Sequence, residues 1–138
     1  MSKPKKKRDK SYTPRHVNIP MTGLISEFSL VLHSGLMAAS HNCFTRDLYD
    51  KVGQAINCVR MALEIKPPKE KSIIIVIDGA VRSMNESGAR GDKTGEWTLR
   101  ATEQASILAG IGKIEEALQL LDVVTLYTAM QKLKEIDD

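Results

Sequence analysis

A helical repeat of apolar residues in the first half of the chain constrains the fold more than any other feature. Between residues 46 and 66, apolar side chains recur at spacings of three and four, which places them on one face of an α-helix. They are Leu48, Val52, Ala55, Ile56, Val59, Ala62 and Leu63. Thr45 stands where an N-cap is expected, Asp47 complements the helix dipole in the first turn, and Pro67-Pro68 ends the pattern. We predict a helix between Thr45 and Pro67.

Similar spacing predicts helices on both sides of this one. A first helix from about Thr22 to Ser40 has its apolar face at Leu24, Phe28, Val31, Leu32 and Leu36. Thr94 can cap a later helix, whose face would carry Trp97, Ala101, Ala105 and Leu108.

The glycines of Gly110-Ile111-Gly112 should break or kink that later helix. Beyond them the apolar pattern resumes at Ile114, Ala117, Leu118, Leu121, Leu126, Met130 and Leu133. Asp122 can cap a separate last helix, or one helix can run through this position.

The segment between the two prolines and the glycine-rich stretch fits two structures. From Ser72 to Gly79 the run of five consecutive β-branched residues favours a buried strand. Ile73, Ile77, Ala80, Val81 and Met84 also follow helical spacing. We favour a helix, because no neighbouring strand is present to pair with a lone one. Ser87 to Gly95, with three glycines in nine residues, is predicted to be a loop.

These patterns indicate an all-α fold. Aromatic residues are only 4% of the chain, so the core must be built from aliphatic residues and methionine, which suits packed helices. At 138 residues, we expect one domain over residues 21–138, a single bundle of four to six helices. Its wide apolar stripes suggest a homo-oligomer.

The N-terminal arm, residues 1–20, differs in composition from this body. It lacks apolar periodicity, and we expect it to be disordered, although Val17, Ile19 and Met21 alternate and could lie extended against the body. Residues 1–16 hold seven basic residues against Asp9 alone, a net charge of +6. The remaining residues hold 13 basic and 16 acidic side chains, a net charge of −3. The predicted nucleic-acid-binding residues are Lys3, Lys5, Lys6, Lys7, Arg8, Lys10 and Arg15.

Such an arm can bind DNA or RNA without sequence preference, because neutralising phosphates releases counterions. Tyr12 adds one ring for base stacking. Cys43 and Cys58, without a secretory signal, indicate free thiols in a reducing compartment, and the longest aliphatic run is far shorter than a membrane span needs. We therefore expect a cytoplasmic protein without a membrane contact.

No motif in the chain predicts an enzyme or a cofactor. The loop from Gly88 to Thr94 resembles a phosphate-binding loop, but only two residues separate its glycines and Asp92 would oppose the anion. Arg90-Gly91-Asp92 also spells the tripeptide that integrins read, which in an intracellular chain carries no information.

Two further groups of residues could form chemical sites but lack the required spacing or partners. His33, His41, Cys43 and Cys58 lack the paired short spacings of zinc knuckles, and neither histidine has an evident orienting acid for a cysteine nucleophile. We place His33 beside the apolar face of the first helix, Cys58 beside that of the second, and Glu115-Glu116 on a solvent-facing side. We expect no metal, no cofactor and no enzymatic activity.

The segment from Tyr12 to Met21, which reads YTPRHVNIPM after a lysine-rich start, resembles the opening of a group of small proteins carried on bacterial prophages and plasmids. Leu121-Asp122 followed by Leu126-Tyr127 is similar to their C-terminal helix. Some members of that group are classed as Fis-like transcriptional regulators, which read the major groove with a basic C-terminal helix-turn-helix. Residues 111–138 here contain three basic and six acidic residues, a poor composition for reading a groove.

Three functional hypotheses follow from these observations. The first is a mobile-element accessory protein that contacts nucleic acid through Lys3 to Arg15. The second is an inhibitor or adaptor that binds a host protein through the acidic body and the loop from Arg90 to Lys93. The third is a virion or assembly component.

Overall fold

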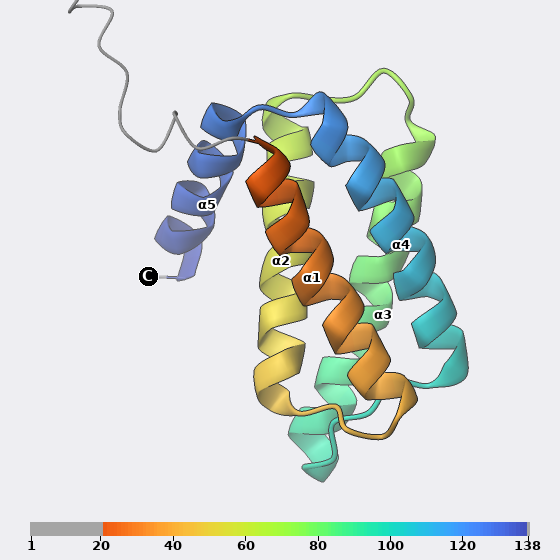
Figure 1. Cartoon of the computed structure of the whole chain (residues 1–138). Coiled ribbons are helices and arrows are strands. Elements are labelled where there is room, and N and C mark those ends of the chain that lie inside the picture. Colours follow the sequence, from red (N-terminus) through yellow and green to blue (C-terminus); the bar gives the residue numbers. More distant parts are fainter. Residues whose placement is uncertain (1–20, 138) are drawn as a thin grey trace, which may run out of the picture.

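The computed structural model describes residues 21–137, and within that range helices are joined by short connecting segments, without a strand (Figure 1). Five helices follow one another: α1 Met21–Ser40, α2 Arg46–Ile65, α3 Ser72–Thr94, α4 Ala101–Leu120 and α5 Val123–Asp137. The predicted all-α class and the predicted number of helices are confirmed. Residues 1–20, and with them the predicted arm, lie outside the described part of the chain.

Helices α1 to α4 form a closed ring. Helix α1 packs on α2 and α4, α3 packs on both α2 and α4, and α2 also contacts α4 across the bundle. Helix α5 packs on α2 and lies at the side of the ring (Figure 1). The largest fully buried side chains come from all five helices; they include Leu32, Ile56, Ile77, Ile111 and Leu126.

Two helix starts follow from local hydrogen bonding. Thr45 caps α2 as predicted, since the backbone N–H of Leu48 donates to its hydroxyl oxygen at 3.2 Å. Asp122 opens α5, because the N–H of Thr125 donates to its carboxylate at 2.7 Å. Hydrogen bonds from the backbone N–H and the side chain of Thr125 lower the pKa of Asp122, and Lys66 at 3.3 Å lowers it further. The last two helices are therefore separate.

The β-branched run after Pro68 is helical, as we favoured. Ile73, Ile77, Ala80 and Met84 are buried at helical spacing on α3, so burial of one face outweighs the local preference of the run for extended structure. Ile75, in the middle of the run, points to solvent.

The predicted loop from Ser87 to Gly95 is wrong. Helix α3 continues to Thr94 and ends at Gly95, whose φ of 79° is the left-handed conformation of a helix C-cap. Gly88 and Gly91 are buried inside the helix, each packed against an aromatic ring, Tyr49 at the first and Trp97 at the second. A Cβ at either position would collide with that ring. Here glycine permits close packing and does not mark a turn.

The predictions for the start and the face of the next helix are also wrong. Thr94 does not cap it; its hydroxyl donates to the carbonyl of Arg90 at 2.8 Å inside α3, and Trp97 lies in the connecting segment. Helix α4 begins at Ala101 and buries Ile107, Ile111, Ile114 and Leu118, whereas Ala101 and Leu108 of the predicted face are exposed.

Gly110 and Gly112 do not interrupt α4. Gly110 is buried, and a Cβ at this position would lie 2.5 Å from the Cβ of Ala80 on α3. The glycine therefore lets α3 and α4 approach closely, and the predicted break or kink is wrong.

Candidate interaction surface

The seven basic residues predicted to bind nucleic acid all belong to the arm, outside residues 21–137. Their role in binding nucleic acid therefore stays a prediction. Within the described residues, the remaining candidate groups can be placed one by one.

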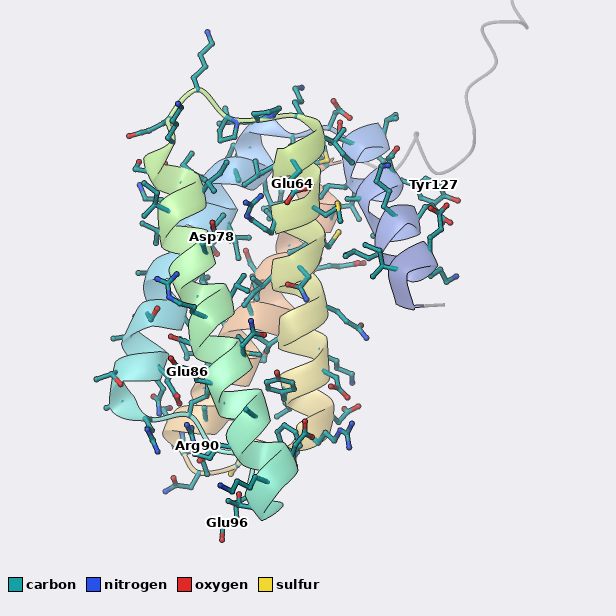
Figure 2. The ribbon with its side chains drawn as sticks, turned by 180° about the vertical axis from the view of Figure 1, so that it is seen from behind. Glu64, Asp78, Glu86, Arg90, Glu96 and Tyr127 are labelled. Atoms are coloured by element: carbon teal, nitrogen blue, oxygen red, sulfur yellow. The ribbon has the colours of Figure 1, made fainter. Side chains whose placement is uncertain are left out.

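The segment that resembled a phosphate-binding loop is the end of α3 (Figure 2). The guanidinium of Arg90 donates to both carboxylate oxygens of Glu103, at 3.0 Å and 2.7 Å, and to the carbonyl of Thr98 at 3.2 Å. Glu103 also accepts from the N–H of Arg100 at 2.8 Å, at the start of α4. Glu103 is only 4% exposed, and hydrogen bonding to Arg90 lowers the pKa of its carboxyl group. This network fixes the α3–α4 connection, and the guanidinium of Arg90 is already hydrogen-bonded within the molecule.

The histidines and cysteines lie apart. His33 on α1 contacts Glu115 on α4 at 3.0 Å, and Ser29 donates to the same carboxylate oxygen at 2.8 Å. This contact places Glu115 against α1, where we had expected a solvent-facing side. His41 lies beyond the end of α1, and among residues 21–137 no three His, Cys, Asp or Glu side chains form a cluster that could hold a metal ion.

The two thiols have opposite environments. Cys43 is exposed, whereas Cys58 is buried in α2 beside α5, with its Sγ 3.9 Å from the carbonyl oxygen of Leu126. Burial raises the pKa of Cys58 to about 11, so it is a poor nucleophile at neutral pH.

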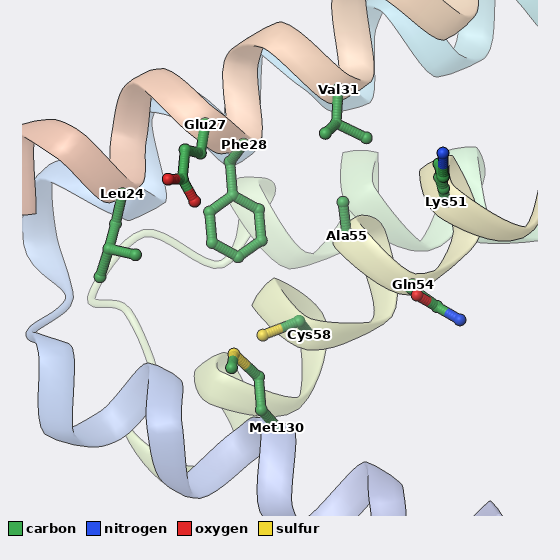
Figure 3. Close-up of a pocket in the computed structure, with 9 residues that line it drawn as sticks. All are labelled: Leu24, Glu27, Phe28, Val31, Lys51, Gln54, Ala55, Cys58 and Met130. Atoms are coloured by element: carbon green, nitrogen blue, oxygen red, sulfur yellow. The ribbon is translucent and has the colours of Figure 1, made fainter. Parts of the chain in front are cut away.

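A groove of about 400 Å³ opens between α1, α2 and α5 (Figure 3). We call it the α5-side groove. In Figure 3, Phe28 of α1 and Met130 of α5 point toward Cys58 on the floor of the groove. Its lining is completed by Leu24, Glu27, Val31, Lys51, Gln54 and Ala55. The wall is mainly apolar, with Glu27 and Lys51 at its polar edge.

A second groove, of about 410 Å³, lies on the other flank of α1, toward α4. We call it the α4-side groove. Leu36 and Met37 of α1 and Leu108 of α4 provide its apolar surface, and His33, Ser40, His41, Gln104 and Ala105 complete it.

Between these grooves, α1 presents an uncharged outer side to solvent. Leu30 is 68% exposed and Met37 is 64% exposed, and they lie seven residues apart on the same side of the helix. The other exposed positions of α1 are Thr22, Gly23, Ser26, Ser34 and Ser40, with Glu27 and His33 at the two edges of this side. We call the outer side of α1 together with the two grooves the α1 face.

Helix α1 is unusual in charge as well as exposure. Glu27 is the only Asp, Glu, Lys or Arg among its twenty residues. By length and composition α1 could also cross a membrane, but core helices of soluble proteins can have the same length and composition. Yet only Leu32, Gly35 and Ala39 of α1 are fully buried. The outer side of a helix on a soluble bundle is normally charged, so this composition is typical of a contact surface.

Sequence reasoning did not identify this surface. Leu30 and Met37 lie off the apolar stripe that defined the core side of α1, and were given no role. The available signal was the single charge in residues 21–40. Comparison with known protein families, with characterised proteins and with solved structures found no match.

Proposed function

We propose that this protein is a non-enzymatic accessory protein of a bacterial mobile element, which contacts nucleic acid in the host cytoplasm through its basic arm. The resemblance of residues 12–21 to prophage and plasmid proteins supports the mobile-element origin. The nucleic-acid contact rests on one observation, the separation of charge between the arm and the body.

The body offers little attraction to a phosphate backbone. Residues 21–137 contain 13 basic and 15 acidic side chains, so their net charge is −2, against +6 for residues 1–16. Six of the basic residues are held in ion pairs with acids of the body: Arg46, Lys51, Arg60, Lys66, Arg90 and Lys113. The affinity for a polyanion should therefore reside in Lys3, Lys5, Lys6, Lys7, Arg8, Lys10 and Arg15.

A pair of triple variants tests this proposal in the full chain. One replaces Lys5, Lys6 and Lys7 by Gln, and the matched control replaces three exposed body lysines, Lys69, Lys71 and Lys93, by Gln. Both remove three positive charges. Binding to short DNA and RNA is measured by mobility shift at about 50 and about 200 mM salt.

We expect the wild type and the body variant to bind at low salt and to weaken steeply at high salt. The arm variant should bind at least tenfold more weakly. Equal loss in both variants would show that net charge alone matters, and absence of binding by the wild type at low salt would refute the proposal.

A protein-binding role is the second candidate, favoured by the exposed apolar α1 face. The working surface first expected for it, a loop from Arg90 to Lys93, is the end of α3. A specific protein partner retained by the arm variant, but lost when Leu30 is replaced by Glu, would support this role.

A further inference from the structure

The strongest feature that the arm hypothesis leaves unexplained is the α1 face. Of the ten large apolar side chains that are exposed within residues 21–137, four belong to it, namely Leu30, Met37, Leu108 and Met130. Exposed apolar side chains that gather in one place mark contact sites, whereas scattered ones need no explanation.

The shape of the face suits a second copy of itself. Leu30 and Met37 form a ridge, and an apolar groove runs along each flank of the same helix. In a two-fold symmetric contact the same patch is used on both copies, so it must contain projections and matching hollows. The ridge of one copy can enter a flanking groove of the other.

The groove volumes favour side chains over a whole helix. Each groove measures about 400 Å³. A ten-residue helix is about 15 Å long and about 10 Å wide, which corresponds to roughly 1,200 Å³. Each groove can thus take the two or three apolar side chains that a ridge such as Leu30 and Met37 offers, and is too small to enclose a whole helix.

The charge of the face also fits self-association. Two identical patches brought together carry the same charge, so a strongly charged face would repel itself. The outer side of α1 carries no Asp, Glu, Lys or Arg apart from Glu27 at its edge; Lys51 of α2 lines the same groove and is paired with Asp47. His33 and Glu115, at the other edge, already contact each other.

The area of the face is sufficient for a weak dimer. A helix of twenty residues is about 30 Å long, and α1 with the facing slopes of its neighbours is about 20 Å wide, because packed helices lie 8–10 Å apart. The contact would bury roughly 600 Å² per copy and 1,200 Å² in total, at the lower end of specific interfaces.

We propose that the α1 face binds the α1 face of a second copy of this chain, forming a two-fold symmetric dimer centred on Leu30 and Met37. The two copies exchange apolar side chains between ridge and groove, and their arms remain outside the contact. This inference does not depend on nucleic-acid binding by the arm.

The test is the mass of the full-length protein in solution, measured by sedimentation equilibrium from about 2 to about 200 µM, because dimers follow mass action. Leu30→Glu and Met37→Glu each place a charge in the proposed contact. Ile75→Glu is the matched control: Ile75 is 68% exposed, like Leu30, but lies on α3 away from the α1 face. We expect a concentration-dependent dimer whose dissociation constant rises at least tenfold in the two α1 variants and is unchanged in Ile75→Glu.

Three results would overturn the proposal. The wild type could remain monomeric at about 200 µM, Ile75→Glu could weaken the dimer as much as Leu30→Glu, or dimers could form only after residues 1–16 are removed, which would assign the face to the arm. For a monomeric wild type, co-sedimentation with phosphatidylcholine vesicles that Leu30→Glu abolishes would assign it to lipid.

A gain-of-signal measurement covers the case in which the Glu variants fail to fold. In a Cys43→Ser background, Leu30→Cys and Ile75→Cys present equally exposed thiols, while Cys58 is buried. A short bifunctional maleimide should join two copies through residue 30 and not through residue 75. Equal cross-linking of the two variants, or none at residue 30, would overturn the proposal.

Discussion

Replacing Gly110 by Ala tests the close approach of α3 and α4. A Cβ at Gly110 would lie 2.5 Å from the Cβ of Ala80 and 3.8 Å from the carbonyl oxygen of Val76. The first distance is well below van der Waals contact. Because the Cβ of Ala80 is fixed to the α3 backbone, no side-chain rotation relieves the clash, and the helices must separate. Gly112, two residues later, is exposed and has nothing within 4 Å of its would-be Cβ.

Comparing alanine substitutions at the two glycines therefore separates the free-energy cost of crowding from the effect of helix propensity. Alanine in a helix interior is more favourable than glycine by about 0.8–1 kcal/mol. Crowding a packed core typically costs about 1–3 kcal/mol. Gly112→Ala should therefore stabilise the protein by up to about 1 kcal/mol, and Gly110→Ala should destabilise it by about 1 kcal/mol. The difference between the two variants, in which propensity cancels, should be about 1–3 kcal/mol.

The assay is urea unfolding followed by circular dichroism, with all proteins at one concentration. The linear dependence of the unfolding free energy on urea gives the difference directly, provided that the slopes agree. Equal stabilisation by Gly110→Ala and Gly112→Ala would refute close packing at Gly110. It would show that the two helices lie further apart than described, or yield without cost.

Four further predictions concern single residues. Arg90→Ala leaves the buried Glu103 carboxylate unpaired and should cost about 2–4 kcal/mol in urea unfolding; a loss below about 0.5 kcal/mol would contradict the network. Because the pKa of Glu103 is lowered by folding, its contribution is present above the unfolded value near 4.3 and is lost as the pH falls through the folded pKa, so stability should fall less steeply in acid for Glu103→Gln than for the wild type. At pH 8 a disulfide reagent should label Cys43 quickly and Cys58 slowly, and Cys43→Ser should remove the fast phase; a fast phase in Cys43→Ser would contradict the burial of Cys58. Asp122→Ala should cost about 1 kcal/mol and expose α5 amides to hydrogen exchange first, whereas Asp122→Asn should retain most of the cap; uniform exchange would contradict this.

The parts of the fold that could be predicted are those set by one helix and its own sequence. Periodicity located α1 and α2, since a buried face repeats every 3.6 residues whatever it packs against. The cap at Thr45 could also be predicted, because it depends on residues three positions apart. In α3, the repeat of Ile73, Ile77 and Ala80 was a better guide than β propensity.

The errors arose at glycines whose packing partners lie outside their own helix. Gly88, Gly91 and Gly110 look like turn or break signals in isolation. Gly88 meets Tyr49 and Gly110 meets Ala80, both far away in the sequence, whereas Gly91 meets Trp97 in the segment after its helix, and the sequence does not reveal these pairings. Placing the cap at Thr94 then drew Trp97 into α4 and shifted its predicted face.

The two candidate surfaces also differ in how far the sequence predicts them. The charge of the arm is a property of composition and needs no structure to be recognised. The α1 face is different, because the sequence shows only that α1 has a single charged residue, whereas the structure shows that its neighbours leave Leu30 and Met37 uncovered.

The most direct test of the account is the salt dependence of nucleic-acid binding. For double-stranded DNA, the logarithm of the affinity falls with the logarithm of salt concentration with a slope of about −0.9 per phosphate neutralised. Replacing Lys5, Lys6 and Lys7 by Gln should therefore reduce the magnitude of the slope by up to about 2.7. The control in which Lys69, Lys71 and Lys93 are replaced should keep the wild-type slope. If instead the body variant changes the slope and the arm variant does not, the body binds the nucleic acid and the central claim is wrong.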